Sequence, residues 1–259
     1  MKKSRIVVLA AMVVVLAFSM TACGGSDDSS SDKPVYKVGT EPTFPPFDTT
    51  DEDQNIVGLD MDLIEAIGED QGFDVEFQNL SFDGLIPALK AGNIDIVAAG
   101  MNKDDEDRQK EVDFSDSYYE SKLFVAVTED NTTINSVDDL TADMKVAAQT
   151  GTTGASKVQE LADAGKIKEA VILDGLDTCM MKLINGDVAA VINDKPVTEA
   201  YMKKQPDKIK MVGEALNAEN YGFAVQKGNT ELLDKINAGL KNIKDNGTYD
   251  DLVDEWFNK

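Results

Sequence analysis

The chain has 259 residues, of which 42% are hydrophobic and 28% charged, so it can bury a sizeable core in one large or two medium domains. It contains no histidine and only two cysteines, which excludes Ser-His-Asp and Cys-His triads and the common zinc sites, so no metal or cofactor is predicted. Acidic residues outnumber basic ones 48 to 25, and a net charge of −23 argues against nucleic-acid binding.

The first 22 residues are predicted to be a secretory signal peptide. Lys2, Lys3 and Arg5 precede an apolar run at 6–18, which is shorter than the roughly 18 to 20 residues of a spanning helix. The segment MTAC that ends at Cys23 resembles the lipobox of bacterial lipoproteins, whose cysteine is acylated and becomes the first mature residue. An acyl anchor on Cys23 would hold the chain at the outer face of the cytoplasmic membrane, on the extracellular or periplasmic side.

Residues 23–33 are predicted to be a flexible tether, because this stretch is small and polar and has nothing to bury. Removal of residues 1–22 takes away three basic residues and no acidic ones, which changes the net charge from −23 to −26. Such a surface does not adhere to anionic lipid by itself, so the predicted membrane contact depends on the anchor.

Predicted strands and helices alternate from Pro34 onward. In chain order, strands are expected at 35–39, 73–77, 94–99, 123–127, 145–148, 171–173, 188–192, 209–212 and 223–225. Helices are expected at 60–67, 82–91, 155–164, 176–184, 194–204, 230–245 and 249–257. The alternation predicts an α/β protein with largely parallel sheets, and Cys179 in the apolar stretch 176–184 is expected to be buried.

Several motifs then occur in an order and spacing typical of one family. They are VGTEPTFPPF at 38–47, VGLDMDL at 57–63, RQKEVDFS at 108–115, QTGTT at 149–153, ND at 193–194 and GTY at 247–249. Together they resemble the polar amino-acid-binding proteins, solute-binding protein family 3, that serve bacterial ABC importers. The resemblance covers nearly the whole mature chain and implies an amino acid ligand and permease subunits as partners, with the chain as a monomer.

The resemblance also implies a type II periplasmic-binding-protein fold, in which two α/β lobes are joined by two hinge strands and close on the ligand. Lobe 1 is expected to comprise 34–119 and 222–259, and lobe 2 to comprise 121–218. The hinges are expected near 118–121 and 218–221.

Arg108 is the only arginine of the mature chain, since Arg5 lies in the signal peptide. A planar guanidinium binds a carboxylate with two parallel hydrogen bonds, which the point charge of lysine cannot do. The alternative is that Arg108 merely offsets the acidic run at 104–107 on a solvated surface. The residues alone support both interpretations equally, and the resemblance implies the ligand role.

The loop at 150–154 lies between a predicted strand and a predicted helix, which brings free backbone N–H groups to one point. This arrangement suits an anion, although an ordinary glycine turn capped by threonine fits the same pattern. The resemblance implies that Thr153 and Arg108 share the ligand carboxylate.

Asp194 follows an apolar strand and begins a helix, so it is either a ligand contact or a plain N-cap before Lys195-Pro196. The resemblance assigns it to the ligand's α-ammonium group, together with main-chain Gly100 and with Asn102. The segment from Gly100 to Arg108 is one residue longer than the family pattern, which leaves Asn102 and Lys103 as competing candidates.

The ligand side chain is expected to contact Phe44, Phe82 and Glu41, with Gln149 and Asn193 as further contacts, whereas Phe47 is expected in the core. A cationic side chain would gain a carboxylate and two ring faces, so arginine or lysine is predicted over glutamine, and both over acidic amino acids. Glutamine or cystine binding on this scaffold is the alternative. A further alternative is a dehydratase-like enzyme that uses Glu41 or Asp194 as a general acid or base. The lipobox, and the residues expected to hold both charged groups of an amino acid, argue against this alternative.

Overall fold

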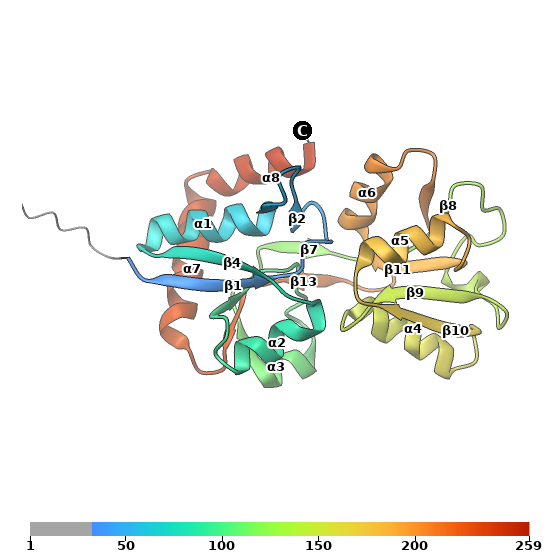
Figure 1. The fold of residues 1–259 in the computed structure, drawn as a ribbon, viewed down its shortest axis with the longest axis horizontal. Coiled ribbons are helices and arrows are strands. Elements are labelled where there is room, and N and C mark those ends of the chain that lie inside the picture. Colours follow the sequence, from blue (N-terminus) through green and yellow to red (C-terminus); the bar gives the residue numbers. More distant parts are fainter. Residues whose placement is uncertain (1–32, 259) are drawn as a thin grey trace, which may run out of the picture. The chain divides into compact units, whose positions relative to one another are not determined.

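Two five-stranded sheets form the framework of the protein in the computed structural model, which describes residues 33–258 (Figure 1). The first sheet has the order β4-β1-β5-β14-β6, and the second has the order β10-β9-β11-β8-β12. The first sheet consists of β1 (Val35–Thr40), β4 (Asp74–Asn79), β5 (Ile96–Val97), β6 (Val112–Phe114) and β14 (Ala224–Gln226). The second consists of β8 (Leu123–Thr128), β9 (Lys145–Gln149), β10 (Glu169–Leu173), β11 (Ala190–Asp194) and β12 (Ile209–Val212).

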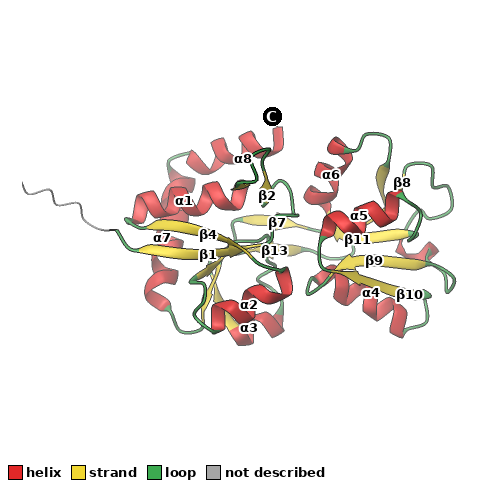
Figure 2. Cartoon of the chain, viewed as in Figure 1, coloured by secondary structure: helices red, strands yellow, loops and turns green. Residues whose placement is uncertain are grey.

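Helices cover both faces of each sheet, as Figure 2 shows. The helices of the first sheet are α1 (Leu59–Gln71), α2 (Phe82–Lys90), α3 (Glu106–Glu111), α7 (Thr230–Asp245) and α8 (Thr248–Asn258). Those of the second sheet are α4 (Thr153–Asp163), α5 (Leu176–Ile184) and α6 (Lys195–Lys204). Each sheet, together with the helices packed on its two faces, forms one lobe. The first lobe contains the first sheet, and the second lobe contains the second sheet.

Successive strand residues point to opposite faces, and this alternation sorts the core into layers. In the second lobe, Val146 and Ala148 belong to the cluster that contains Val158 of α4. Ala147 belongs instead to the cluster with Cys179 of α5. Each fully buried aliphatic side chain of this kind contributes roughly 1.5 to 3 kcal/mol to the free energy of folding.

The antiparallel pair β7 (Tyr119–Ser121) and β13 (Glu219–Tyr221) lies between the two lobes, where the chain crosses from one to the other and back. The first strand after each crossing, β8 and β14, runs antiparallel to its neighbours, whereas β1 is parallel to β4 and β5 and β9 is parallel to β10 and β11. The sheets are therefore mixed, with one reversed strand each. The predicted α/β class is confirmed, but half of the pairings within the two sheets are antiparallel, because the reversed strand lies between two others.

Most predicted elements are present with boundary shifts of one or two residues, whereas the helix predicted at 60–67 continues to Gln71. The strand predicted at 188–192 is Ala190–Asp194, so Asp194 closes the strand and does not begin the helix. The helix predicted from 155 begins at Thr153, and the strand predicted at 94–99 pairs only at Ile96–Val97. The structure also contains short elements that were not predicted: helix α3, strands β6, β2 (Thr49–Thr50) and β3 (Ile56–Val57), and the 3-10 turn Val137–Asp139. Such short segments owe their form to partners distant in sequence. Strands β7 and β13 fall on the two segments that the family resemblance implied as hinges.

Cys179 is fully buried and unpaired, as predicted, and burial raises the pKa of its thiol to about 12. The signal peptide, Cys23 and the tether lie outside the described residues. Within the described part, no helix is both long and apolar enough to cross a membrane.

Candidate functional site

Nine of the ten residues expected to contact ligand line one pocket, and Asn193 is the exception. The walls of the pocket are formed by Glu41, Phe44, Phe82, Gly100, Asn102, Arg108, Gln149, Thr153 and Asp194, together with Ala99, Thr152 and Glu219. The space between these walls is about 330 Å³, counted to its open side. We call this pocket the slot; its walls come from both lobes, at the end of β1 and the ends of β9 and β11.

Arg108 enters the slot from α3, whose N-cap Asp105 accepts hydrogen bonds from the amides of Asp107 and Arg108. The side chain is 9% exposed, and its NH1 and NH2 groups donate to the carbonyl oxygens of Asn102 (3.1 Å) and Gly151 (2.9 Å). The guanidinium carbon lies 5.3 Å from the centre of the Phe82 ring. A guanidinium has five N–H donors, so these two bonds leave three for a ligand.

Helix α4 presents its N-terminus at the opposite wall. The Thr152 hydroxyl accepts from the amide of Ala155 at 3.0 Å and donates to the carbonyl of Gln149 at 2.7 Å. Thr152 is therefore the cap, while Thr153 is the first helical residue. The amides of Thr153 and Gly154 have no acceptor within the helix, so they suit an anion in the slot.

Asp194 does not cap α6 with its side chain. Its Oδ1 atom accepts from the hydroxyls of Ser121 (2.9 Å) and Tyr221 (2.5 Å), both on the crossing strands. Asp194 thus occupies the N-cap position of α6 as expected, but its carboxylate lines the slot, at 6% exposure, and does not bond to the helix amides. Burial and the neighbouring carboxylate of Glu219 raise the pKa of Asp194 to about 8.

The Gly100 turn fits the slot only as glycine. Its φ is +52°, and a Cβ atom there would lie 2.6 Å from a ring carbon of Phe44. Its amide donates to Asp60 Oδ2 at 2.7 Å, which fixes the turn against α1. In this loop Asn102 lines the slot, whereas Lys103 lines a separate depression.

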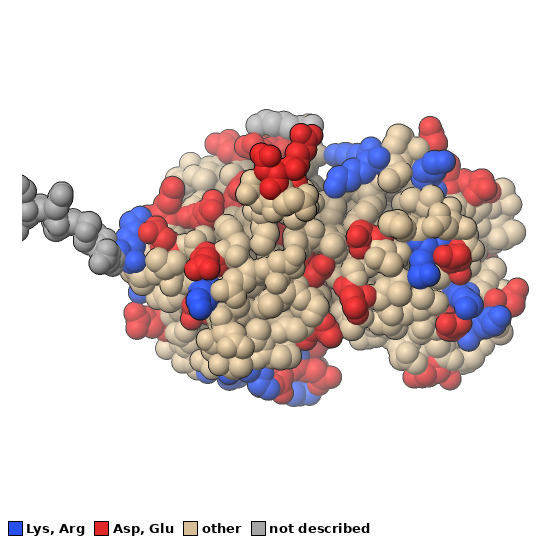
Figure 3. Space-filling model, in the orientation of Figure 1, with Lys and Arg blue, Asp and Glu red and all other residues tan. Residues whose placement is uncertain are grey.

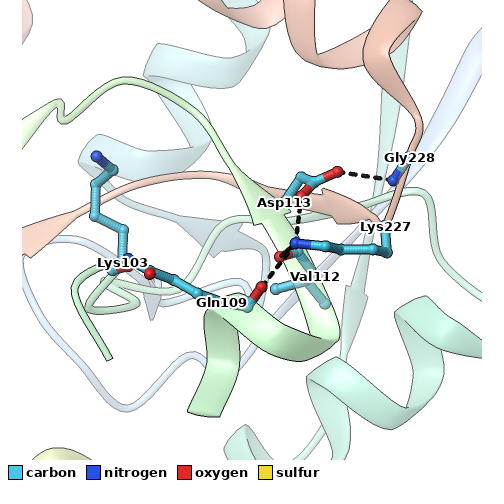
Figure 4. A network of polar contacts seen from close by, with 6 residues as sticks. All are labelled: Lys103, Gln109, Val112, Asp113, Lys227 and Gly228. Carbon is cyan, nitrogen blue, oxygen red and sulfur yellow. Dashed lines mark hydrogen bonds and ion pairs between the residues drawn. The ribbon is translucent and has the colours of Figure 1, made fainter. Parts of the chain in front are cut away.

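Figure 4 shows Lys103 beside Gln109, in the neighbourhood of the ion pair between Lys227 and Asp113. Gln109 Nε2 donates to the Lys103 carbonyl at 2.7 Å, and the Lys103 amide donates to the carbonyl of Asn220 at 2.8 Å. Of the two competing candidates, only Asn102 lies in the slot. Lys103 is part of a separate surface depression, away from Glu41.

Glu41 also lines the slot and is 8% exposed. It accepts from the Thr43 hydroxyl (2.7 Å) and from Gln149 Nε2 (2.8 Å), and the second bond joins the two lobes. Burial raises the pKa of Glu41, although these hydrogen bonds oppose the shift. Asn193, expected as a further contact, lies outside the slot and donates to Asp194 O and the Thr198 hydroxyl, both at 3.3 Å.

The two lobes also contact each other directly around the slot. Thr43 Oγ1 accepts from the amide of Leu176 at 3.2 Å, and the Tyr201 hydroxyl donates to the Thr43 carbonyl at 3.0 Å. Figure 3 shows acidic side chains along the line where the two lobes meet. Such a border attracts cations and repels anions.

The motifs and the geometry agree with a comparison against known families. Residues 36–259 match the family described as bacterial extracellular solute-binding proteins, family 3. The chain belongs to this family. The arginine-binding extracellular protein ArtP of Bacillus subtilis is 33% identical over 259 residues, which cover 99% of this chain and 98% of that protein.

Two solved structures of an ancestral arginine-binding protein are similar to this solute-binding protein, each with 43% sequence identity. The one bound to arginine has a TM-score of 0.83 and covers 87% of this chain and 99% of its own. The one bound to glutamine has a TM-score of 0.80 and covers 88% of this chain and 99% of its own. The type II periplasmic-binding-protein fold is confirmed by this match, and the relatives are binding proteins and not enzymes.

Sequence reasoning missed three of the slot residues in this solute-binding protein: Ala99, Thr152 and Glu219. Glu219 is the most informative, because it is a carboxylate with only 2% exposure. It is two residues from Tyr221 on β13, so the two side chains share one face of that strand. The sequence signal for this face is weak, since a three-residue strand is too short to establish an alternating pattern.

A pair of buried acids supports the slot from beneath. Asp60 Oδ2 accepts from the Gly100 amide and the Tyr118 hydroxyl (2.8 Å), and Asp48 Oδ2 accepts from the Thr40 hydroxyl (2.8 Å). Among the described residues, the Oδ1 atoms of Asp48 and Asp60 have no hydrogen-bond partner. Burial and the charge of Asp60 raise the pKa of Asp48 well above its usual value.

Replacing Asp48 with asparagine is expected to reduce the pH dependence of stability. As the pH rises, the Asp48 carboxyl loses its proton at a lower pH in the unfolded chain than in the folded protein. The free energy of unfolding therefore falls as the pH rises above about 4, by at most about 1.4 kcal/mol per pH unit. Urea unfolding of Asp48→Asn at pH 5 and pH 8 should show a smaller loss than the wild type shows. The exposed-loop variant Asp53→Asn is the control. An unchanged pH dependence of stability in Asp48→Asn would contradict a raised pKa of Asp48 in the folded protein.

Proposed function

We propose that this solute-binding protein captures a basic amino acid, with arginine as the preferred ligand, and delivers it to the permease subunits of an ABC importer. The observation that carries the proposal is a buried carboxylate, Glu41, in the slot wall together with the aromatic rings of Phe44 and Phe82. A guanidinium there would gain a carboxylate and aromatic faces. The arginine-binding names of its relatives support the same ligand.

The ligand's main-chain groups are assigned to other residues of the slot. The α-carboxylate would bind the three unused N–H donors of Arg108 and the amides at the start of α4. The α-ammonium group would bind Asp194, main-chain Gly100 and Asn102. These contacts come from both lobes, so the closed form binds ligand more tightly than an open form, and ligand shifts the population toward closure.

Lobe 1 is assigned to 34–119 and 222–259, and lobe 2 to 121–218, with the paired strands β7 and β13 as the hinge. The closed face formed by the two lobes is the surface that we expect the permease to recognise. Cys23 is the proposed acylation site, and an acyl anchor there would keep the protein at the outer side of the cytoplasmic membrane.

Glutamine is the second candidate, because a similar ancestral protein has been solved with glutamine bound. Gln149 of this chain shows that Glu41 accepts a hydrogen bond from an amide at 2.8 Å. An amide ligand would leave the negative charge of Glu41 without a cationic partner in a buried site, which favours the basic ligand.

Calorimetric titration of the purified protein with L-arginine, L-lysine, L-glutamine and L-glutamate tests the ligand class. Arginine or lysine should bind most tightly and glutamate at least about 100-fold more weakly, since a buried like-charge contact costs several kcal/mol. Glu41→Gln should narrow the gap between arginine and glutamine, and the exposed-loop variant Glu52→Gln should leave it unchanged. Tightest binding of glutamate or of an aliphatic amino acid would contradict the assignment of Glu41.

A further inference from the structure

Two buried carboxylates, Asp194 and Glu219, line the slot close to Arg108. Asp194 comes from the end of β11 and Glu219 from the crossing strand β13, and they are 6% and 2% exposed. Both line the slot, and Asp194 accepts a hydrogen bond from Ser121, the residue that is paired in register with Glu219. The proposed function uses only Asp194, so Glu219 is a charged group in the binding site that still lacks a role.

The crossing strands fix the position of both acids. Glu219 is paired in register with Ser121 of β7, and the Ser121 hydroxyl donates to Asp194 Oδ1 at 2.9 Å. Tyr221, on the same face of β13 as Glu219, donates to the same oxygen at 2.5 Å. Asn217 Nδ2 donates to Glu219 Oε1 at 2.9 Å. The two acids are therefore held by the hinge itself, not by a mobile loop.

Neither acid has a basic partner in direct contact. Within residues 33–258, no salt bridge includes Asp194 or Glu219. The charged or titratable groups that face Asp194 are Glu219, Tyr221 and the guanidinium of Arg108. Arg108 donates its two observed side-chain hydrogen bonds to backbone carbonyls. Two ionised carboxylates in a desolvated site repel each other strongly, and such pairs retain a proton in common.

We propose that Asp194 and Glu219 together form the seat for the ligand's α-ammonium group, and that Asp194 holds a proton which it releases when the ammonium binds. This inference rests on the proposed function, because it takes the ligand to be an amino acid held in this slot. In the step, neutral Asp194 and the ammonium ion become a carboxylate in contact with the ammonium, and the proton passes to the solvent buffer. The positive charge of the ammonium takes the place of the proton between the two acids.

The direction of the pH effect follows from linkage. The raised pKa of Asp194, about 8 in the structure, falls when a cation binds beside it. Affinity should then rise with pH up to that value, by as much as tenfold per unit, and fall as the pH is lowered. Above this range the ligand's own amino group begins to lose its proton, so the test belongs between pH 6 and pH 8.

The experiment is titration calorimetry with L-arginine, and in parallel with L-glutamine, in buffers of different ionisation enthalpy. The dependence of the observed heat on the buffer gives the number of protons released per ligand bound. For the wild type we expect roughly 0.9 proton at pH 7 and about 0.5 at pH 8, which are the protonated fractions for a pKa of about 8. Glu219→Gln should release fewer protons than the wild type at pH 7, because it removes the carboxylate that repels ionised Asp194, while burial continues to raise the pKa of Asp194.

Two further variants test whether the proton release comes from Asp194 and Glu219 and not from other acidic residues. Glu41→Gln, elsewhere in the slot, should change affinity and keep the proton release. Glu120→Gln, an exposed residue on β7, should change neither quantity. Binding of either amino acid without proton release, or equal release by Glu219→Gln, would overturn the acid pair and leave the proposed function standing. Failure of the wild type to bind any amino acid would overturn both.

Discussion

Arg108→Ala is expected to weaken amino acid binding by roughly 30-fold to several-thousand-fold, equivalent to about 2 to 5 kcal/mol. The side chain is 9% exposed and is already oriented by bonds to two carbonyls, one from each lobe, and by the Phe82 ring. Removing it would leave both carbonyls without this donor and the ligand carboxylate without its main cationic partner. Part of the loss would therefore come from closure of the lobes and part from the ligand contact.

Arg108→Lys should recover little of the affinity, because an ammonium group cannot satisfy two carbonyls and a carboxylate in one plane. Lys110→Ala, an exposed residue on the same helix, is the matched control and should bind as the wild type does. Titration calorimetry gives the affinities, and circular dichroism checks that each variant is folded. Near-normal affinity in a folded Arg108→Ala or Arg108→Lys protein would remove Arg108 from the ligand site.

Cys23→Ser is expected to release nearly all of the protein from the membrane fraction. The apolar run at 6–18 is too short to span a bilayer, and the mature net charge of −26, three basic residues fewer than the full chain, repels anionic lipid. Retention would then depend on the acyl chains, each buried CH₂ group contributing about 0.8 kcal/mol. Ser26→Ala in the predicted tether is the control variant.

Fractionation of cells expressing the two variants, followed by mass spectrometry of the mature N-terminus, measures this effect. The wild type and Ser26→Ala should carry lipid on Cys23 and sediment with membranes. Sedimentation of Cys23→Ser to the same extent as the wild type would show that the acyl anchor is not what holds the protein.

The order of the elements could be predicted from the sequence because it depends on local patterns. The helix Leu176–Ile184 has its predicted bounds, since its apolar residues recur at helical spacing and a glycine precedes it. Helix α1 ends before Gly72, which adopts a φ of +77° that favours glycine. Short strands such as β7 and β13 have too few residues for a pattern, and only their pairing defines them.

The residues of the slot likewise include some that local sequence patterns indicate and others that only the folded structure identifies. The sequence by itself indicated Arg108 as the lone mature arginine, the threonine turn before α4 and Asp194 after an apolar strand, because each signal lies in a residue type next to a predicted element. It could not choose between Asn102 and Lys103, since one added residue changes which side chain of a loop faces inward. Only the tertiary structure decided that Asn102 lines the slot, that Glu41 meets Gln149 across it, and that Glu219 lies beside Asp194. These contacts join residues 25 to more than 100 positions apart, and no local pattern records which distant side chains the folded backbone brings together.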